Sequence, residues 1–163
     1  MDIYSPFKPL AELEGTLAEF YGWCKTLFKG DEDAASLFSR LAADELSHVA
    51  IIDYQRRLVR DRPGEFTVVQ IDLQPVAEAM SLIAVVRQSN QPPALDQAVR
   101  VALTLETNAA EYHCKTAMQQ ANPGVAELLE ALGSGDREHL ARLVRFAGAR
   151  GLEHTPGTSP PVA

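Results

Sequence analysis

The chain has 163 residues, 46% of them apolar, and a formal net charge of −7 at pH 7. This length and composition suit one folded domain with a hydrophobic core. The negative charge argues against a nucleic-acid partner and against an anionic membrane surface, since both attract basic proteins.

The N-terminus and the cysteines indicate a compartment. Residues 1–6 contain neither the basic start nor the apolar segment of a secretory signal. The longest purely apolar run, residues 82–86, is too short to span a bilayer. Cys24 and Cys114 form no Cys-x-x-Cys motif, which excludes a rubredoxin-type iron site within the chain. We therefore expect a cytoplasmic protein with two free thiols, buried or at helix surfaces.

Two amphipathic helices are predicted first. Apolar residues recur every three or four positions over residues 9–29, and Gly30 ends that helix. The next helix opens with the acidic residues 31–33, which suit a helix N-terminus, and runs to about Arg60. The sequence Asp-Arg-Pro-Gly at residues 61–64 then breaks it.

A long connection follows, over residues 61–93. Residues 66–71 are rich in β-branched and aromatic residues, which allows an extended segment. Pro75 favours the start of a short helix that continues to about Val86. The polar, proline-containing residues 88–93 end this connection.

The second half of the chain predicts two more helices. The third runs from residue 94 to about residue 121. The fourth starts near residue 122 with a proline at its first position, and two glycines in its middle allow a kink. We expect residues 1–150 to form one domain and residues 151–163, rich in proline and glycine, to form an irregular tail.

Polar residues interrupt the apolar stripe of each predicted helix. A buried carboxylate is costly unless another group compensates its charge. The interrupting residues have ligand-type side chains: Glu14, Glu45, His48, Glu106, Asp136 and His139.

The two halves of the chain also match each other. Glu45 and His48 on the second helix correspond to Asp136 and His139 on the fourth, with equivalent apolar neighbours. Each carboxylate lies 14–16 residues from the turn of its own hairpin, or roughly 23 Å at about 1.5 Å per residue. The sequence therefore predicts an all-α bundle of two helix hairpins, joined by the long crossover, with all six side chains near its middle.

Four buried carboxylates would repel one another, and two divalent cations would balance their charge. Carboxylate and imidazole ligands suit iron or manganese, and zinc can compete. A glutamate from each of two helices, together with a carboxylate-x-x-His motif from each of the other two, is the recurrent pattern of two-metal helical bundles. We therefore expect two metal ions per chain, with iron as the expected metal and manganese or zinc as alternatives.

These features resemble the rubrerythrin-like branch of the ferritin-like di-iron superfamily, over residues 8–149. The motifs are Leu13-Glu14 with Glu19-Phe20-Tyr21, Leu41 with Glu45-Leu46-Ser47-His48, and the second-half copies of both. The resemblance implies a ferritin-like four-helix bundle. It implies bridging ligands Glu45 and Asp136, terminal ligands Glu14 and Glu106, and one histidine, His48 or His139, on each metal.

The resemblance also implies a function. Proteins of this family form dimers and use non-haem di-iron to reduce peroxide or dioxygen, or to oxidise ferrous iron. Asp136 stands where the family usually has glutamate, Ala109 where peroxide-reducing members carry a further carboxylate, and His113 where the repeat of Tyr21 would stand. The rubredoxin domain is missing, so an external electron donor is expected. These departures bear on peroxidase turnover more than on metal binding.

Some alternatives remain open from the sequence. The bundle could be a non-catalytic metal-binding or iron-storage protein with a structural or buffered metal pair, or a degenerate bundle without metal. Glu138 could replace Asp136 as a ligand, although it points away from the face of His139. Tyr21 could be a core residue or hydrogen-bond a ligand carboxylate, and His113 could support a ligand in the same way.

Overall fold

The structure, a computed structural model, describes residues 7–61, 73–107 and 138–152. The regular structure of these residues is helical throughout, and they contain no strand. The all-α prediction is therefore confirmed for the described part of the chain. The helices are α1 (Phe7–Leu27), α2 (Glu32–Asp61), α3 (Gln74–Gln88), α4 (Leu95–Thr107) and an unlabelled helix over residues 138–149.

The observed helix ends differ from the predicted ones by one or two residues. α1 begins at Phe7 because Pro9 falls in its first turn, where a missing backbone N–H costs nothing. It ends at Leu27, and the backbone N–H of Asp31 donates to the carbonyl of Phe28 at 2.9 Å in a tight turn. The predictions for residues 66–71, 108–137 and 153–163 lie outside the described residues.

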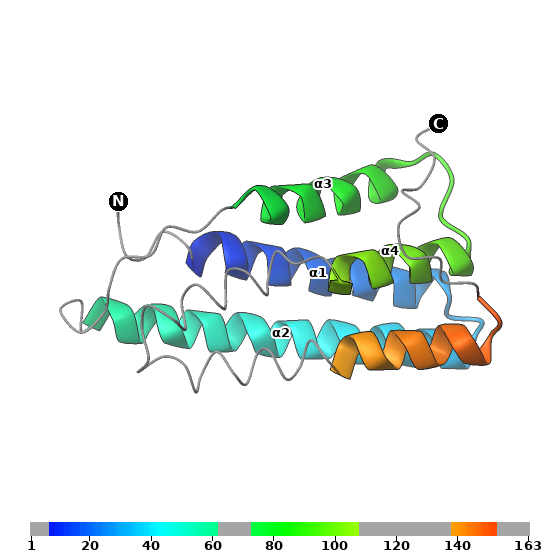
Figure 1. Cartoon of the computed structure of the whole chain (residues 1–163), viewed down its shortest axis with the longest axis horizontal. Helices are drawn as coiled ribbons and strands as arrows, with labels where there is room; N and C mark the ends of the chain where they lie inside the picture. The colour runs from blue at the N-terminus through cyan, green and yellow to red at the C-terminus, as the bar shows by residue number, and fades with distance from the viewer. Residues whose placement is uncertain (1–6, 62–72, 108–137, 153–163) are drawn as a thin grey trace.

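The described helices run roughly along one common direction (Figure 1). α1 packs against α2 along its length and against α3 on another side. α1, α3 and the helix of residues 138–149 run in one direction, and α2 and α4 run in the other. α4 and residues 138–149 both lie near the turn that joins α1 to α2. Segments far apart in the sequence therefore meet in this half of the molecule.

The turn between α1 and α2 is fixed by charged side chains. Asp31 Oδ1 accepts the backbone N–H of Ala34 at 3.1 Å, which caps α2. We call the helix of residues 138–149 the last helix. Arg150, directly after it, contacts Asp31 at 2.6 and 2.8 Å and Asp33 at 3.1 Å. Its guanidinium also lies over the Phe146 ring, and its contact with Asp31 lowers the pKa of that carboxyl. These contacts attach the last helix to the start of α2.

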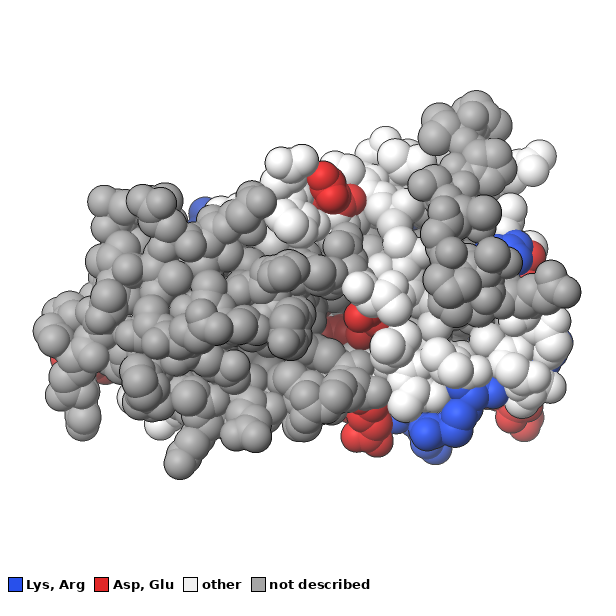
Figure 2. All heavy atoms as spheres, viewed as in Figure 1, with Lys and Arg blue, Asp and Glu red and all other residues white. Residues whose placement is uncertain are grey.

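No described helix is both long and apolar enough to cross a membrane. On the face drawn in Figure 2, basic side chains of the described residues adjoin acidic ones and form no broad basic area. Among the described residues, Arg142 forms ion pairs with Asp44 and Glu138, and Arg150 forms one with Asp31.

The last helix packs into the core through Leu143, which is fully buried, whereas its neighbour Val144 is half exposed. We expect Leu143→Ala to lower the free energy of unfolding by about 2–5 kcal/mol, because it leaves a cavity. Val144→Ala should change it by no more than about 0.5 kcal/mol. Urea unfolding of both variants measures the difference, and equal effects would contradict the observed docking of this helix.

Candidate metal centre

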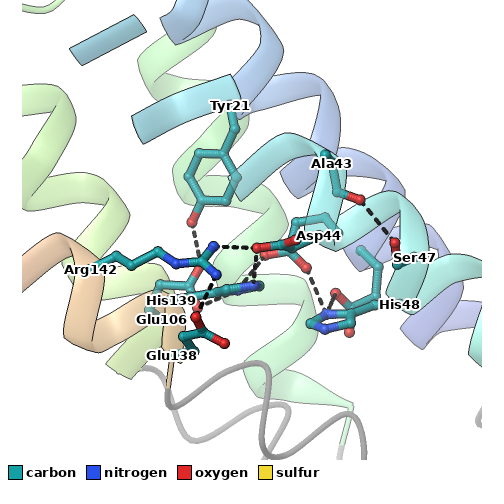
Figure 3. A network of polar contacts seen from close by, with 11 residues as sticks. Tyr21, Ala43, Asp44, Ser47, His48, Glu106, Glu138, His139 and Arg142 are labelled. Carbon is teal, nitrogen blue, oxygen red and sulfur yellow. Dashed lines mark hydrogen bonds and ion pairs between the residues drawn. The ribbon is translucent and has the colours of Figure 1, made fainter. Parts of the chain in front are cut away.

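Five of the six predicted ligands lie within the described residues, and they come together between four helices (Figure 3). Asp136 and His113 lie outside the described residues. Each of the five lies on the buried face of its helix, beside buried apolar residues. The apolar stripes that these residues interrupt in the sequence therefore indicated correctly which face of each helix is buried. They are Glu14 on α1, Glu45 and His48 on α2, Glu106 on α4, and His139 on the last helix.

One group of potential ligands joins α1 and α2. His48 Nδ1 lies 3.0 Å from Glu45 Oε2 and 3.4 Å from Glu14 Oε2. All three residues are at most 5% exposed. Buried carboxylates without a compensating cation are energetically costly, so this arrangement requires either a proton or a metal ion between the three side chains.

A second group joins α2, α4 and the last helix. His139 Nδ1 lies 3.2 Å from Glu45 Oε1 and 3.5 Å from Glu106 Oε2. Glu45 therefore belongs to both groups and presents one oxygen to each histidine. The two imidazole rings stack with their centroids 5.2 Å apart. Glu45 thus lies at the centre of the site, with one histidine on either side.

The histidines titrate far from their usual range. Burial acts to lower the pKa of His48, but hydrogen bonds to Glu14 and Glu45 raise it to about 10. Burial likewise opposes the rise at His139, whose contacts with Glu106 and Glu45 bring its pKa to about 10. Without metal, both imidazoles are therefore protonated at neutral pH and compensate the carboxylates.

The spacing of the donor atoms suits metal ions. In each group the donor atoms lie within 4.8 Å of one another. Ligands about 2.1 Å from a metal, at angles of about 90–110°, are themselves about 3.0–3.4 Å apart. The contacts of His48 with Glu14 and Glu45 fall in this range, and those of His139 are close to it. His139 Nδ1 is also buried with no hydrogen-bond partner among the described residues. These buried groups could hold a metal ion.

Tyr21 supports this site from α1. Its hydroxyl donates to Glu106 Oε1 at 2.6 Å, while its ring is fully buried and stacks on Phe38. The structure therefore joins the two roles that the sequence left open, since the ring packs in the core and the phenol contacts a candidate ligand. The bond fixes one oxygen of Glu106 and leaves the other directed at His139.

We expect Tyr21→Phe to lower metal affinity about 10- to 100-fold, the usual effect of losing a group that orients a ligand. The ring packing is retained, so unfolding should become easier by only about 1.5–3 kcal/mol, the contribution of a hydrogen bond to a charged group. Metal titration and thermal unfolding measure the two effects. Tyr54→Phe, which removes the hydroxyl of a half-exposed tyrosine on α2, is the control. Equal affinities of the two variants would contradict the role of Tyr21.

The site contains two polar residues that the sequence analysis missed. Asp44 Oδ2 lies 3.4 Å from His139 Nε2, on the side of the ring away from Glu45. Arg142 contacts the same oxygen of Asp44 (Figure 3). The sequence shows only that Asp44 directly precedes Glu45 and that Arg142 follows His139 by about one helical turn. Neither position reveals that Asp44 on α2 contacts residues of the last helix.

Two further residues considered from the sequence, Glu138 and Cys24, belong to neither group of potential ligands. Glu138 is exposed and pairs with Arg142 at 2.7 Å. Cys24 is a buried free thiol, and burial raises its pKa to about 12. Cys114 and Ala109 lie outside the described residues.

Comparison with protein-family models, with curated proteins and with solved structures gave no match.

Proposed function

We propose that this protein is a di-iron carboxylate oxidoreductase that reduces peroxide or dioxygen, or oxidises ferrous iron. In this proposal its fold is a ferritin-like four-helix bundle of the rubrerythrin-like kind, in which α1, α2, α4 and the last helix provide the ligands. The resemblance of the sequence further supports a cytoplasmic homodimer that receives electrons from an external donor.

The position of Glu45 is the observation that carries this proposal. Its two oxygens face two different histidines, and each histidine faces a second carboxylate. A carboxylate between two such groups is suited to bridge two metal ions. A single structural metal needs only one closed set of ligands and does not account for both halves of the arrangement.

Charge supports two divalent ions. Glu14, Glu45, Glu106 and Asp136 carry −4 when ionised, and two neutral histidines add nothing. Two divalent cations therefore neutralise the site, whereas one leaves it at −2. The mixture of carboxylates and imidazoles suits iron.

The residues of the chain have separable roles in this proposal. Glu14 and His48 would hold one ion, Glu106 and His139 would hold the other, and Glu45 would bridge them. Bound iron supplies the Fe²⁺/Fe³⁺ couple needed to reduce peroxide or dioxygen or to oxidise ferrous iron. The protein excludes water from the ligands by burying them, and Tyr21 holds Glu106 in place.

A direct assay tests the proposal. Metal-free protein is loaded anaerobically with Fe²⁺, then mixed with hydrogen peroxide or oxygen, and consumption of the oxidant is followed with the optical spectrum. We expect consumption together with absorption that a reductant bleaches. Glu14→Ala should lose both, and Glu12→Ala, an exposed glutamate on the same helix, should retain both. Protein that binds iron but neither consumes oxidant nor oxidises Fe²⁺ would overturn the proposal.

One sequence feature favours a second candidate, a metal store or buffer. Ala109 stands where peroxide-reducing rubrerythrins have an additional carboxylate, so turnover lacks that group here. This candidate predicts tight metal binding without consumption of oxidant in the same assay.

A further inference from the structure

We propose that Tyr21, Phe20 and Trp23 form a path along which single electrons pass between the surface of the protein and the candidate metal centre. This inference rests on the proposed function, because it assigns the place where electrons of the external donor enter. The path itself consists of side chains of α1, so it can be measured in the metal-free protein.

The inner end of the path is the phenol of Tyr21. Its hydroxyl donates a hydrogen bond of 2.6 Å to Glu106 Oε1, and the other carboxylate oxygen of Glu106 faces His139 (Figure 3). The Tyr21 side chain is fully buried. Oxidation of a phenol removes an electron and releases the hydroxyl proton, and a carboxylate bonded to that hydroxyl is placed to accept the proton. Tyr21 is therefore equipped to exchange one electron with a centre that Glu106 helps to form.

Ring contacts continue from Tyr21 toward the surface. The ring centroids of Tyr21 and Phe20 lie 5.6 Å apart, and those of Phe20 and Trp23 lie 6.0 Å apart. Both distances are typical of aromatic rings in contact. Phe20 is fully buried, whereas Trp23 is partly exposed. Because electron tunnelling weakens exponentially with distance, an oxidisable indole at this place shortens each step between the surface and the buried phenol.

A second set of ring contacts leads away from Tyr21 on another side. Tyr21 stacks on Phe38 with centroids 6.2 Å apart, and Phe38 stacks on the partly exposed Phe28 at 5.8 Å. In the part of the chain that the structure describes, this branch ends at Phe28, and phenylalanine is far harder to oxidise than tyrosine or tryptophan. Trp23 is the only tryptophan of the chain. The branch through Phe20 is therefore the one that joins Tyr21 to an oxidisable side chain at the surface.

Each electron moves inward along the path in three steps. Tyr21 gives an electron to the metal centre while its phenol proton passes to Glu106. Trp23 then gives an electron to the tyrosyl radical, which recovers its proton from Glu106, and the indole nitrogen releases a proton to water. An external one-electron donor finally reduces the indolyl radical, which takes a proton back from water. The donor is oxidised by one electron, and the three side chains return to their starting states.

The test is pulse radiolysis of the metal-free protein. Azide radicals oxidise indoles in preference to phenols at neutral pH, so they place the radical on Trp23, the single tryptophan. Electronic coupling along a path is the same in both directions, and a phenol bonded to a carboxylate is oxidised more easily than an indole. Tyr21 should therefore reduce the indolyl radical and become a phenoxyl radical, whose absorption is distinct.

Two variants and two matched controls locate the path. Tyr21→Phe removes the oxidisable phenol and keeps the ring, and Phe20→Leu removes the ring between Tyr21 and Trp23. Tyr54→Phe removes a half-exposed phenol from α2, and Phe28→Leu removes a ring from the other branch. Tyr21→Phe preserves the buried ring, so it decides the question even if Phe20→Leu does not fold.

In the wild type we expect phenoxyl absorption to rise as indolyl absorption falls, at a rate independent of protein concentration. Tyr21→Phe should lose this rise and Phe20→Leu should slow it, whereas Tyr54→Phe and Phe28→Leu should behave like the wild type. Absence of the rise in the wild type, its retention in Tyr21→Phe, or equal rates in Phe20→Leu and Phe28→Leu would overturn the path.

The iron-loaded protein tests the entry point. With reduced methyl viologen as the one-electron donor, Trp23→Phe should slow reduction of the oxidised centre and leave the iron content unchanged. An unchanged rate of reduction would overturn the assignment of Trp23.

The outcomes separate this inference from the proposed function. Radical transfer from Trp23 to Tyr21 in a protein whose iron form consumes no oxidant would support the path and overturn only the oxidoreductase. Consumption of oxidant by a protein without this radical transfer would overturn only the path.

Discussion

Replacing Glu45 with alanine is expected to abolish the binding of both metal ions and all turnover. Each of the two ligand groups contains one oxygen of Glu45, so a single substitution removes a ligand from both. The loss of a shared ligand should reduce iron content from about two per chain, as the two-metal pattern requires, to near zero. Elemental analysis after anaerobic loading with Fe²⁺ and gel filtration measures this content.

Two further variants serve as comparisons for Glu45→Ala. His48→Ala removes a ligand from one group only, so it should retain up to half of the iron, bound on the His139 side. Glu12→Ala removes an exposed glutamate that pairs with Lys8, and it should load like the wild type. A Glu45→Ala protein that retains a full complement of iron would show that Glu45 does not lie between the two ions.

Metal affinity is expected to increase steeply as the pH rises from neutral to about 10. The pKa of both His48 and His139 is about 10 without metal, so each ion must displace a proton from its histidine. Apparent affinity at each position should therefore rise about tenfold per pH unit over this interval. Calorimetry at pH 7.5 in buffers of different ionisation enthalpy should show about one proton released per ion.

The stability of the metal-free protein should change in the opposite direction. A histidine whose pKa is raised by folding stabilises the protein fully below its unfolded pKa, about 6.5. That contribution disappears as the pH rises through the folded pKa, about 10. Thermal unfolding without metal should therefore show a falling Tm between these values. A His48→Gln variant should lose part of this pH dependence and release one proton fewer on metal binding. Metal binding without proton release would contradict the assignment of the histidines.

The inward faces of the helices could be predicted because burial imposes a period on the sequence. Glu14, Glu45 and Glu106 each interrupt an apolar stripe, and the structure buries all three side chains. Their similar distances from the predicted turns also indicated that they meet at one height. The helix ends were less predictable, since the tight turn after Leu27 depends on backbone hydrogen bonds that no residue type specifies.

Contacts between distant helices could not be predicted in the same way. The pairing of Asp44 with His139 and Arg142 depends on how the last helix is rotated against α2, which helical spacing does not determine. The role of Tyr21 could not be predicted either. A tyrosine that only packs in the core and a tyrosine that also hydrogen-bonds Glu106 both occupy a buried position in the sequence pattern. Only the three-dimensional arrangement distinguishes these possibilities.

The most direct measurement is anomalous X-ray scattering from crystals loaded anaerobically with Fe²⁺, recorded at the iron edge. The proposed site predicts two anomalous peaks, one on either side of the Glu45 carboxylate. One peak should lie beside His48 and Glu14, and the other beside His139 and Glu106. Absence of anomalous density among these side chains, or iron bound only elsewhere on the protein, would contradict the di-iron site.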